Sequence, residues 1–566
     1  MAALLALAGR DDERGRGSKI DLAEAIEQLR GRVAVLYQGG RLTGPRSRPA
    51  ICGLLDQFLV GLPYDASKQS WHAKVALVRM DDAEENAAWR LWIGSRNLTA
   101  SDHLEFGLLL DGSSGPKARG QSIPGVDELA RELVARAALP DSAASLLKTA
   151  GEAKWVTPTG VRVPEVRLLR DSERRYLPVA PRGVEEVTVV SPFLHPRTVR
   201  EIGSWGASNC RRRILSTIPE LARVYAAQGN PLAGYVELLA LNGALQAAEE
   251  AELDESTEVE AGAERHEPGL HAKLLVARRG DRLTMWVGSA NATERAWRGR
   301  NVELVARMEG PATLYSGIEA LLGTARPVTL EQLASIGAVT RDEAEERLEA
   351  ARAHVVATWT GRLVHEEGIF RLACDSPPHS ADTEIGLLVG RVVGPMQVWP
   401  RGAGTILLGV VPPAEQTGLV TLSLRLADKE VTWLQGCSVH PPLGELRDRA
   451  ALAAYLGASA FLVWLRSLLD GELADGDASG PWDASGLIGR AEPPDSADQP
   501  EQITVEEILR SWARDPSAFR LTDQRMRDYL QEVILRVDPA DAKSAALLRD
   551  VGAAWDMLRS ELIGSA

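Results

Sequence analysis

The sequence is poor in cysteine and has no long apolar run. Its 4 cysteines lie far apart and no two form a Cys-x-x-Cys pair, so a disulfide framework is not expected and a reducing compartment is favoured. No stretch of roughly 18 apolar residues is present to cross a membrane. The short apolar run at the start has no basic segment before it, which argues against a signal peptide. These absences favour a cytoplasmic protein without a membrane partner.

Negative charge is plentiful but unevenly placed. The net charge of −14 argues at first against a nucleic-acid partner. Residues 327–566 carry all of it, with 22 basic and 36 acidic side chains, whereas residues 1–326 carry 42 of each. Nine of those 42 acids lie in the segment 249–267, which we expect to be a loosely ordered loop. The rest of the first part is basic on balance and therefore compatible with a polyanionic partner.

Two stretches of the chain resemble each other. One reads WHAKVALV, WRLWIGSRNLT and LEFGLLL, and the other reads LHAKLLVA, LTMWVGSANAT and VELVARM. The matched pairs are His72 with His271, Lys74 with Lys273, Asn97 with Asn291, and Glu105 with Glu303, and they are separated by 194 to 199 residues. We call His72, Lys74, Ser95 and Asn97 the first half-site, and His271, Lys273, Ser289 and Asn291 the second half-site. Such spacing predicts two copies of one structural unit.

Apolar runs typical of strands alternate with helical patterns in both copies. Strands are expected at 32–37 and 187–193, and helices at 21–29, 127–138 and 232–249. This alternation predicts a doubled α/β fold, followed by a β-rich module and a helical C-terminal module. The expected organisation is a tail at 1–20, repeats at 21–150 and 181–326 joined by a linker at 151–180, a helical connector at 327–355, a β-rich domain at 356–440, and a helical domain at 441–566 with an acidic linker at 470–502.

The repeated motif combines residue types that suit a phosphodiester. Side chains two positions apart on a strand share a face, so His and Lys of each His-x-Lys point the same way. The ammonium group suits a phosphate oxygen, while the Gly-Ser turn and the following Asn offer further donors. A Glu can accept the second ring N–H of a histidine and fix its tautomer. Duplicated core histidines are the alternative, but they would leave the two lysines unexplained.

Two such half-sites can perform acid–base and nucleophilic chemistry without a metal. One imidazole can attack phosphorus while the other protonates the leaving oxygen. Two lysines and two amides would then stabilise the charge that Mg²⁺ stabilises in other enzymes. We therefore expect neither a cofactor nor a metal ion at this site.

The duplicated motif resembles that of the phospholipase D superfamily over residues 20–326. The usual family motif has an Asp five residues after the Lys, where this sequence has Arg79 and Arg278. In that respect it is similar to the tyrosyl-DNA phosphodiesterase branch and to some nucleases. The resemblance implies a tandem phospholipase D-like domain and the following roles: His72 as a nucleophile that forms a phosphohistidine and His271 as general acid/base, or the reverse; Lys74, Lys273, Asn97 and Asn291 as phosphate ligands, assisted by Ser95 and Ser289; and Glu105 and Glu303 as groups that orient the imidazoles. Arg96 is an additional candidate phosphate contact or else a solvated arginine.

The function expected from these observations is a nuclease that acts on DNA or RNA, with DNA favoured. The resemblance extends to nucleases of bacterial restriction and anti-phage systems, which often work beside a helicase or another ATPase. The sequence has no P-loop, so such a motor would be a separate partner. A phospholipase or transphosphatidylase and a non-catalytic nucleic-acid-binding scaffold are the alternatives. A weaker signal is a loose zinc-ligand pattern formed by Cys374, His379, Cys437 and His440.

Overall fold

The computed structural model contains two compact units. It describes residues 2–10, 17–44, 50–66, 68–81, 87–97, 103–241, 269–336, 342–470, 503–537 and 542–562. Unit 1 comprises Met1–Val35, Thr43–Val60 and Thr358–Ala566, and unit 2 comprises Leu36–Leu42 and Gly61–Ala357. The mixed α/β class expected from the sequence is confirmed. The acidic segment 249–267, and the acidic linker 470–502 beyond Asp470, lie outside the described residues.

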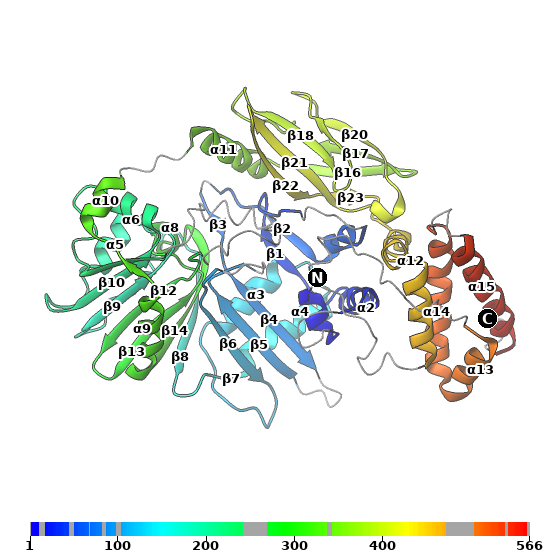
Figure 1. Cartoon of the computed structure of the whole chain (residues 1–566), viewed down its shortest axis with the longest axis horizontal. Coiled ribbons are helices and arrows are strands. Elements are labelled where there is room, and N and C mark those ends of the chain that lie inside the picture. Colours follow the sequence, from blue (N-terminus) through cyan, green and yellow to red (C-terminus); the bar gives the residue numbers. More distant parts are fainter. Residues whose placement is uncertain are drawn as a thin grey trace. The chain divides into compact units, whose positions relative to one another are not determined.

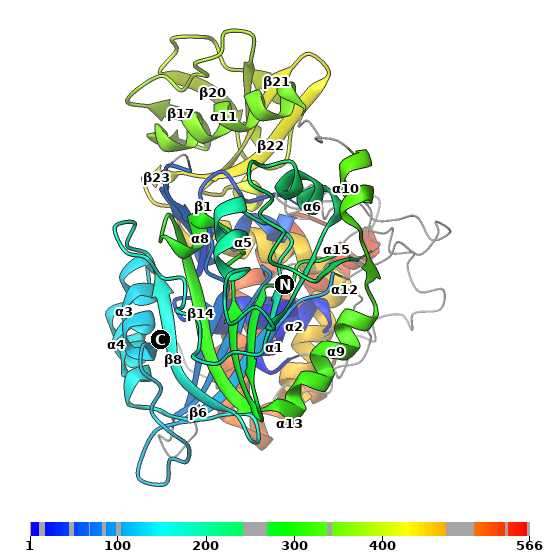
Figure 2. The ribbon, with the colours of Figure 1, turned by 90° about the vertical axis from the view of Figure 1, so that its left-hand side faces the viewer.

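Unit 2 contains a nine-stranded sheet (Figure 1). Its strand order is β15 (Arg326–Pro327), β11 (Glu237–Ala240), β10 (Arg211–Ser216), β9 (Glu186–Val190), β12 (Leu274–Arg279), β13 (Arg282–Gly288), β14 (Asn301–Pro311) and β3 (Ser70–Trp71), with β8 (Arg162–Leu169) also paired to β14. Strands β9, β10 and β11 are parallel to one another, whereas the pairings β9–β12, β12–β13 and β13–β14 are antiparallel. The long strands β8 and β14 lie side by side in Figure 2.

Both faces of this sheet are covered. Successive apolar residues of its strands pack in turn into a core on one face and a core on the other. Val189 and Leu275 pack with α5 (Pro196–Ile202), α6 (Ile218–Tyr225), α8 (Glu294–Trp297) and α10 (Leu330–Ile336). Val190 and Leu274 pack instead with α9 (Tyr315–Gly323). Runs of apolar residues without alternation are what a strand buried on both faces requires.

A second, four-stranded sheet belongs to the first repeat. Its order is β4 (Val75–Asp81), β5 (Ala87–Gly94), β6 (Gly107–Ser113) and β7 (Lys154–Val156), and all pairings are antiparallel. It shares a core with α3 (Val126–Arg136), β8 and β14, in which Trp89 and Trp155 are almost fully buried. The short helices α4 (Asp141–Lys148) and η2 (Thr149–Glu152) lie next to α3 in the structure.

Each repeat contains three consecutive antiparallel strands, and the strands of the two sets pair in equivalent register. Val75 on β4 faces Ile93 on β5, and Leu274 on β12 faces Val287 on β13. Ile93 in turn faces Leu108, as Val287 faces Ala306. All of these positions are related by the offsets of the repeated motif, so the internal duplication extends to the backbone pairing.

Several expectations about the boundaries differ from the structure. The helix expected at 232–249 is wrong in part, because residues 237–240 form the parallel strand β11. The expected linker 151–180 contributes β7 and β8 to the two sheets. The upstream strand of the first repeat, β1 (Val35–Gln38), pairs with β2 (Leu59–Leu62) rather than with β4. In the expected tail 1–20, α1 (Ala2–Ala8) buries Leu4 and Leu5 in the core of unit 1.

Unit 1 contains a β-rich part and a helical part. The β-rich part has two four-stranded sheets, ordered β20 (Thr405–Val410), β17 (Ile369–Cys374), β16 (Gly361–Glu366), β23 (Ser438–His440) and β19 (Met396–Val398), β18 (Gly386–Arg391), β21 (Leu419–Leu426), β22 (Lys429–Gly436). The helical part joins α1 and α2 (Lys19–Leu29) with α12 (Glu445–Asp470), α13 (Val505–Arg514), α14 (Pro516–Ile534) and α15 (Ala542–Leu562) around one core. Helix α11 (Glu343–Ala357) ends the stretch expected as a helical connector.

One described helix has the length and composition of a membrane span, which the sequence analysis did not find. It is Glu445–Leu469 of α12, and 61% of an 18-residue apolar stretch of this helix is buried inside the protein. Gly457 interrupts this helix with a φ of 70°, where the backbone leaves the helical conformation. Burial of this kind is typical of the core helix of a soluble protein, with which the structure is compatible.

Candidate active site

The two half-sites meet because each copy pairs its backbone with the other. Strand β3, which precedes His72, pairs in parallel with the start of β14, and the N–H of His72 donates to the carbonyl of Val302 at 2.9 Å. Leu270, which precedes His271, pairs in parallel with Leu104, and the N–H of His271 donates to the carbonyl of Leu104 at 3.0 Å. Both His-x-Lys motifs are thus held in extended backbone at the ends of strands from opposite repeats.

The two lysines occupy equivalent positions. Lys74 Nζ donates to the carbonyl of His72 at 3.2 Å, and Lys273 Nζ donates to the carbonyl of His271 at 3.0 Å. Lys273 Nζ also donates to the carbonyl of Ser95 in the first half-site at 3.0 Å. Lys74 and Lys273 are only 4% and 2% exposed. Two cations are therefore concentrated in a poorly hydrated site, where their charge acts strongly on a bound anion.

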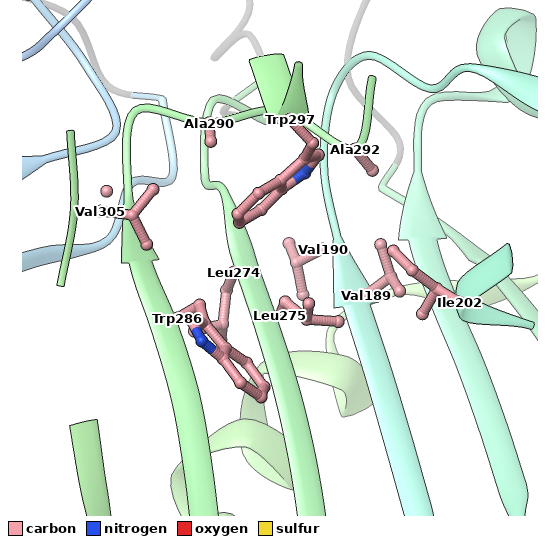
Figure 3. Close-up of a pocket in the computed structure, with 11 residues that line it drawn as sticks. Val189, Val190, Ile202, Leu274, Leu275, Trp286, Ala290, Ala292, Trp297 and Val305 are labelled. Atoms are coloured by element: carbon pink, nitrogen blue, oxygen red, sulfur yellow. The ribbon is translucent and has the colours of Figure 1, made fainter. Parts of the chain in front are cut away.

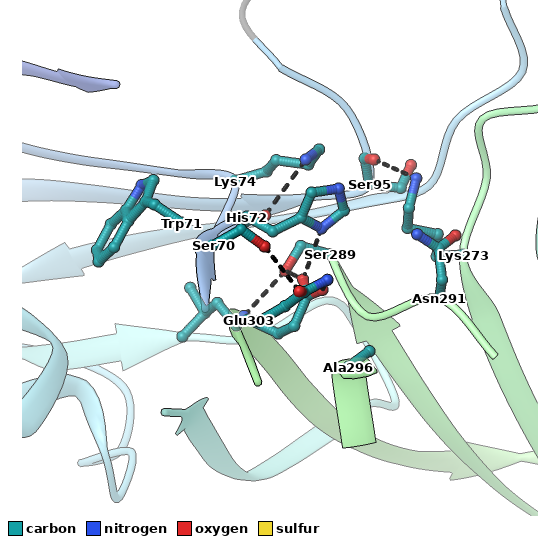
Figure 4. A network of polar contacts seen from close by, with 12 residues as sticks. Ser70, Trp71, His72, Lys74, Ser95, Lys273, Ser289, Asn291, Ala296 and Glu303 are labelled. Atoms are coloured by element: carbon teal, nitrogen blue, oxygen red, sulfur yellow. Dashed lines mark hydrogen bonds and ion pairs between the residues drawn. The ribbon is translucent and has the colours of Figure 1, made fainter. Parts of the chain in front are cut away.

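His72 is oriented by a carboxylate from the other repeat. Its Nδ1 lies 2.9 Å from Oε2 of Glu303, a residue of β14 that is fully buried. The hydroxyl of Ser289 donates to the same carboxylate oxygen (Figure 4). An ionised carboxylate only accepts hydrogen bonds, so Nδ1 of His72 carries the proton and Nε2 carries a lone pair.

In His271 the same ring nitrogen faces a hydrogen-bond donor instead of an acceptor. Its Nδ1 lies 3.3 Å from Nζ of Lys273. An ammonium group only donates, so Nδ1 of neutral His271 is an acceptor and its proton sits on Nε2. The site can therefore supply one imidazole with a lone pair at Nε2 and a second with an N–H at Nε2.

An amide completes the second half-site. Asn291 is 6% exposed, and its Oδ1 accepts a hydrogen bond from the hydroxyl of Ser191 at 3.3 Å. The same hydroxyl also donates to the carbonyl of Phe193, at 2.6 Å. Its counterpart Asn97 is exposed, and Arg96 beside it is half-buried. Figure 4 shows Asn291 near Lys273, on the side of His72 away from Trp71.

The structure assigns some of the expected residues a different place or role. Glu105 occupies the position equivalent to Glu303 but is exposed, so it does not provide the buried carboxylate that Glu303 provides. The hydroxyls of Ser95 and Ser289 are fully buried and accept the backbone N–H groups of Phe106 and Leu304 at 2.9 Å. We had expected these hydroxyls to contact a phosphate. In the structure they instead stabilise the Gly-Ser turns from the buried side.

Sequence reasoning missed the residues that orient the site from behind. Ser191 contacts Asn291. Asn301 contacts Glu303 directly, and Ser70 contacts Asn301. A signal was present for two of them. Ser70 lies two residues before His72 and Asn301 two residues before Glu303, so strand alternation predicts that each shares a face with its partner.

An apolar cavity and the expected zinc pattern do not form chemical sites in the described residues. A cavity beneath α5 and α8 is lined only by glycine and apolar side chains, among them Trp286, Trp297 and Ile202 (Figure 3), so it is a packing void of the core. The loose zinc pattern of the β-rich part does not assemble either. Within the described ranges no three residues among His, Cys, Asp and Glu come together as a metal site.

Comparison with known proteins leaves the family of this chain open. No protein-family model matches the sequence, and no curated protein matches it. The assignment of a function therefore depends on the residues of the site.

Proposed function

We propose that this protein is a metal-independent phosphodiesterase of the phospholipase D type, with one active site assembled from both half-sites. The observation that carries this proposal is that Nδ1 faces a hydrogen-bond acceptor in one imidazole and a hydrogen-bond donor in the other. Glu303 accepts from Nδ1 of His72, whereas Lys273 donates to Nδ1 of His271. A nucleophile needs a lone pair at Nε2 and an acid needs a proton there, and these two partners provide that difference.

The reaction begins with attack by His72. The lone pair of its Nε2 forms a bond to phosphorus, and the P–O bond to the leaving group breaks. The leaving oxygen takes the proton from Nε2 of His271, while Nδ1 of His271 takes one from the ammonium group of Lys273, so that the ring stays neutral. Glu303 stabilises the positive charge of the phosphorylated His72. Lys74 and the amide of Asn291 bind the phosphate oxygens.

Water then reverses these transfers. Nε2 of His271 takes a proton from the water molecule, whose oxygen attacks phosphorus. The N–P bond breaks and its electron pair returns to Nε2 of His72, while Nδ1 of His271 returns its proton to Lys273. The free enzyme is regenerated, and no step requires a metal ion.

The substrate that we favour is nucleic acid, with DNA preferred over RNA, cleaved in the cytoplasm. The basic balance of residues 1–326 outside the segment 249–267 supports a polyanionic substrate. A role as the effector of a bacterial anti-phage or restriction system, beside a separate helicase or ATPase, fits such an activity.

The test combines substrates, chelation and matched variants. Purified protein is incubated with single- and double-stranded DNA, RNA and phospholipid vesicles, with and without EDTA, and the acid-labile phosphoprotein is trapped. We expect nucleic-acid cleavage that survives EDTA and weakens steeply as salt rises, and loss of nearly all turnover in His72→Ala and in His271→Ala. Activity on vesicles alone would favour the phospholipase. Activity restored only by Mg²⁺, or retained by either histidine variant, would contradict the proposal.

A further inference from the structure

A second layer of polar side chains lies behind Glu303. Asn301 Nδ2 donates to Oε1 of Glu303 at 3.3 Å. The hydroxyl of Ser70 donates to Oδ1 of Asn301 at 2.7 Å, and Nε of Arg295 donates to the same oxygen at 3.3 Å. Ser70 lies on β3, Arg295 on α8 and Asn301 on β14, and none of them is part of the repeated motif. Figure 4 shows Ser70 beside His72 and Glu303.

The partners of Asn301 fix the direction of its amide. Nε of Arg295 can only donate and faces Oδ1, and a carboxylate faces Nδ2, so a flipped amide would oppose donor to donor and acceptor to acceptor at these two contacts. Asn301 therefore binds one oxygen of Glu303, while His72 and Ser289 bind the other. A carboxylate held at both oxygens cannot rotate away from the imidazole without breaking these hydrogen bonds.

The other half-site has no equivalent arrangement. By the offsets of the repeat, Gly269 stands where Ser70 stands, His103 where Asn301 stands, and Glu105 where Glu303 stands. The ring of His103 occupies the space that a side chain at position 269 would need, since a Cβ there would lie 2.2 Å from its Nδ1. The polar layer is thus specific to the carboxylate that orients His72.

We propose that Asn301, anchored by Ser70, is a positioning residue that holds Glu303 aligned with His72 and thereby keeps the proton of His72 on Nδ1. This inference rests on the proposed function for its effect on turnover. Its effect on His72 itself is a property of the resting protein, because every contact that carries it is present without substrate.

The first measurement therefore requires no activity. Histidine is labelled with ¹⁵N, the His72 signals are identified by their loss in His72→Ala, and the protonated ring nitrogen of neutral His72 is read from the chemical shifts. We expect the proton on Nδ1 in the wild type, a mixture of both tautomers in Asn301→Leu and Asn301→Asp, and a smaller change in Ser70→Ala. His103→Ala, the matched variant of the other half-site, leaves the tautomer of His72 unchanged.

The second measurement separates positioning from packing. Asn301→Leu keeps the branching and the number of heavy atoms of the side chain but removes its polar groups, and Asn301→Asp keeps its shape but replaces the donor by a negatively charged oxygen beside Glu303. We expect kcat to fall ~10–100-fold in both variants, as is typical for residues that orient a catalytic group. KM should change by less than about threefold, because Asn301 does not contact substrate.

The outcomes distinguish this inference from the proposed function. Wild-type kcat together with an unchanged tautomer in folded Asn301→Leu would overturn the positioning role and leave the phosphodiesterase intact. Absence of phosphodiesterase activity in the wild type would overturn the function, while the tautomer measurement would still decide the role of Asn301. If Asn301→Leu does not fold, Ser70→Ala and Asn301→Asp provide the same readouts.

Discussion

At the scale of single residues, the two copies of the motif have become chemically different. Both keep the His-x-Lys pair and the Gly-Ser turn, but Glu303 is fully buried while Glu105 is exposed. The sequence was sufficient to predict which residue types form the site. It could not predict this difference, because burial of one Glu depends on the strands that the other repeat places around it. The sequence analysis left the order of the two histidines open for the same reason.

The two glutamates provide a matched pair of variants. In Glu303→Gln the amide can turn its NH₂ toward Nδ1 of His72 and stabilise the wrong tautomer, so we expect kcat to fall by a factor on the order of 10²–10⁴. In Glu105→Gln the change is at an exposed position, and we expect activity within about twofold of the wild type. Steady-state kinetics on an oligonucleotide checks both. Equal losses in the two variants would contradict the asymmetry of the half-sites.

At the scale of elements, the strands that carry the site were easier to predict than those around them. The repeated apolar runs match β4, β5, β12 and β13, because strand alternation and turn residues are local signals. The helix expected at 232–249 is wrong at residues 237–240, which form the strand β11. A fully buried parallel strand such as β11 shows no alternation, so its short apolar run resembles a segment of a buried helix.

An ion pair between two of these strands gives a prediction about pH. Arg278 on β12 donates to Glu186 on β9 at 2.8 Å and lowers the pKa of this carboxyl from its usual 4.5, with Arg213 and Tyr315 also close to it. A lowered pKa contributes stability that is present above pH 4.5 and is lost as the pH falls through the pKa of the folded state.

Glu186→Gln should therefore lower the free energy of unfolding of unit 2 by ~1–2 kcal/mol at pH 7. The difference from the wild type should shrink as the pH falls below 4.5. Denaturant titrations at several pH values measure it. Glu185→Gln, which alters a more exposed neighbour, is the control and should change stability little. A deficit of Glu186→Gln that grows toward low pH would contradict the assigned sign.

At the scale of the whole molecule, the chain folds into two units that do not follow its order. Unit 1 combines the first residues with the last two hundred, and α2 packs in one core with α12 and α14. The sequence predicted the β-rich and helical parts but placed residues 21–29 with the first repeat. Amphipathic patterning reveals that a helix has a partner, and long-range packing alone decides which one.

Two units with separate cores predict two unfolding transitions. Trp464 is 1% exposed in unit 1, and Trp155 is 1% exposed in unit 2. Truncation of either to Ala should cost ~3–5 kcal/mol and lower only the transition of its own unit in differential scanning calorimetry. A single transition, lowered by both variants, would show that the chain unfolds as one cooperative body.

The crosswise pairing of β3 with β14 and of Leu104 with Leu270 has a consequence for complementation. Each fragment of a chain cut between the repeats carries one of the two site histidines, His72 or His271, but the carboxylate that orients His72 remains on the other fragment. Val179, between β8 and β9, is 90% exposed and is a suitable point for the cut. We expect fragments 1–179 and 180–566 to be inactive alone and to regain turnover when they are refolded together. A first fragment with His72→Ala should rescue nothing, since the second fragment cannot replace the missing nucleophile. Measurable activity in either fragment by itself would refute the idea that the half-sites depend on one another.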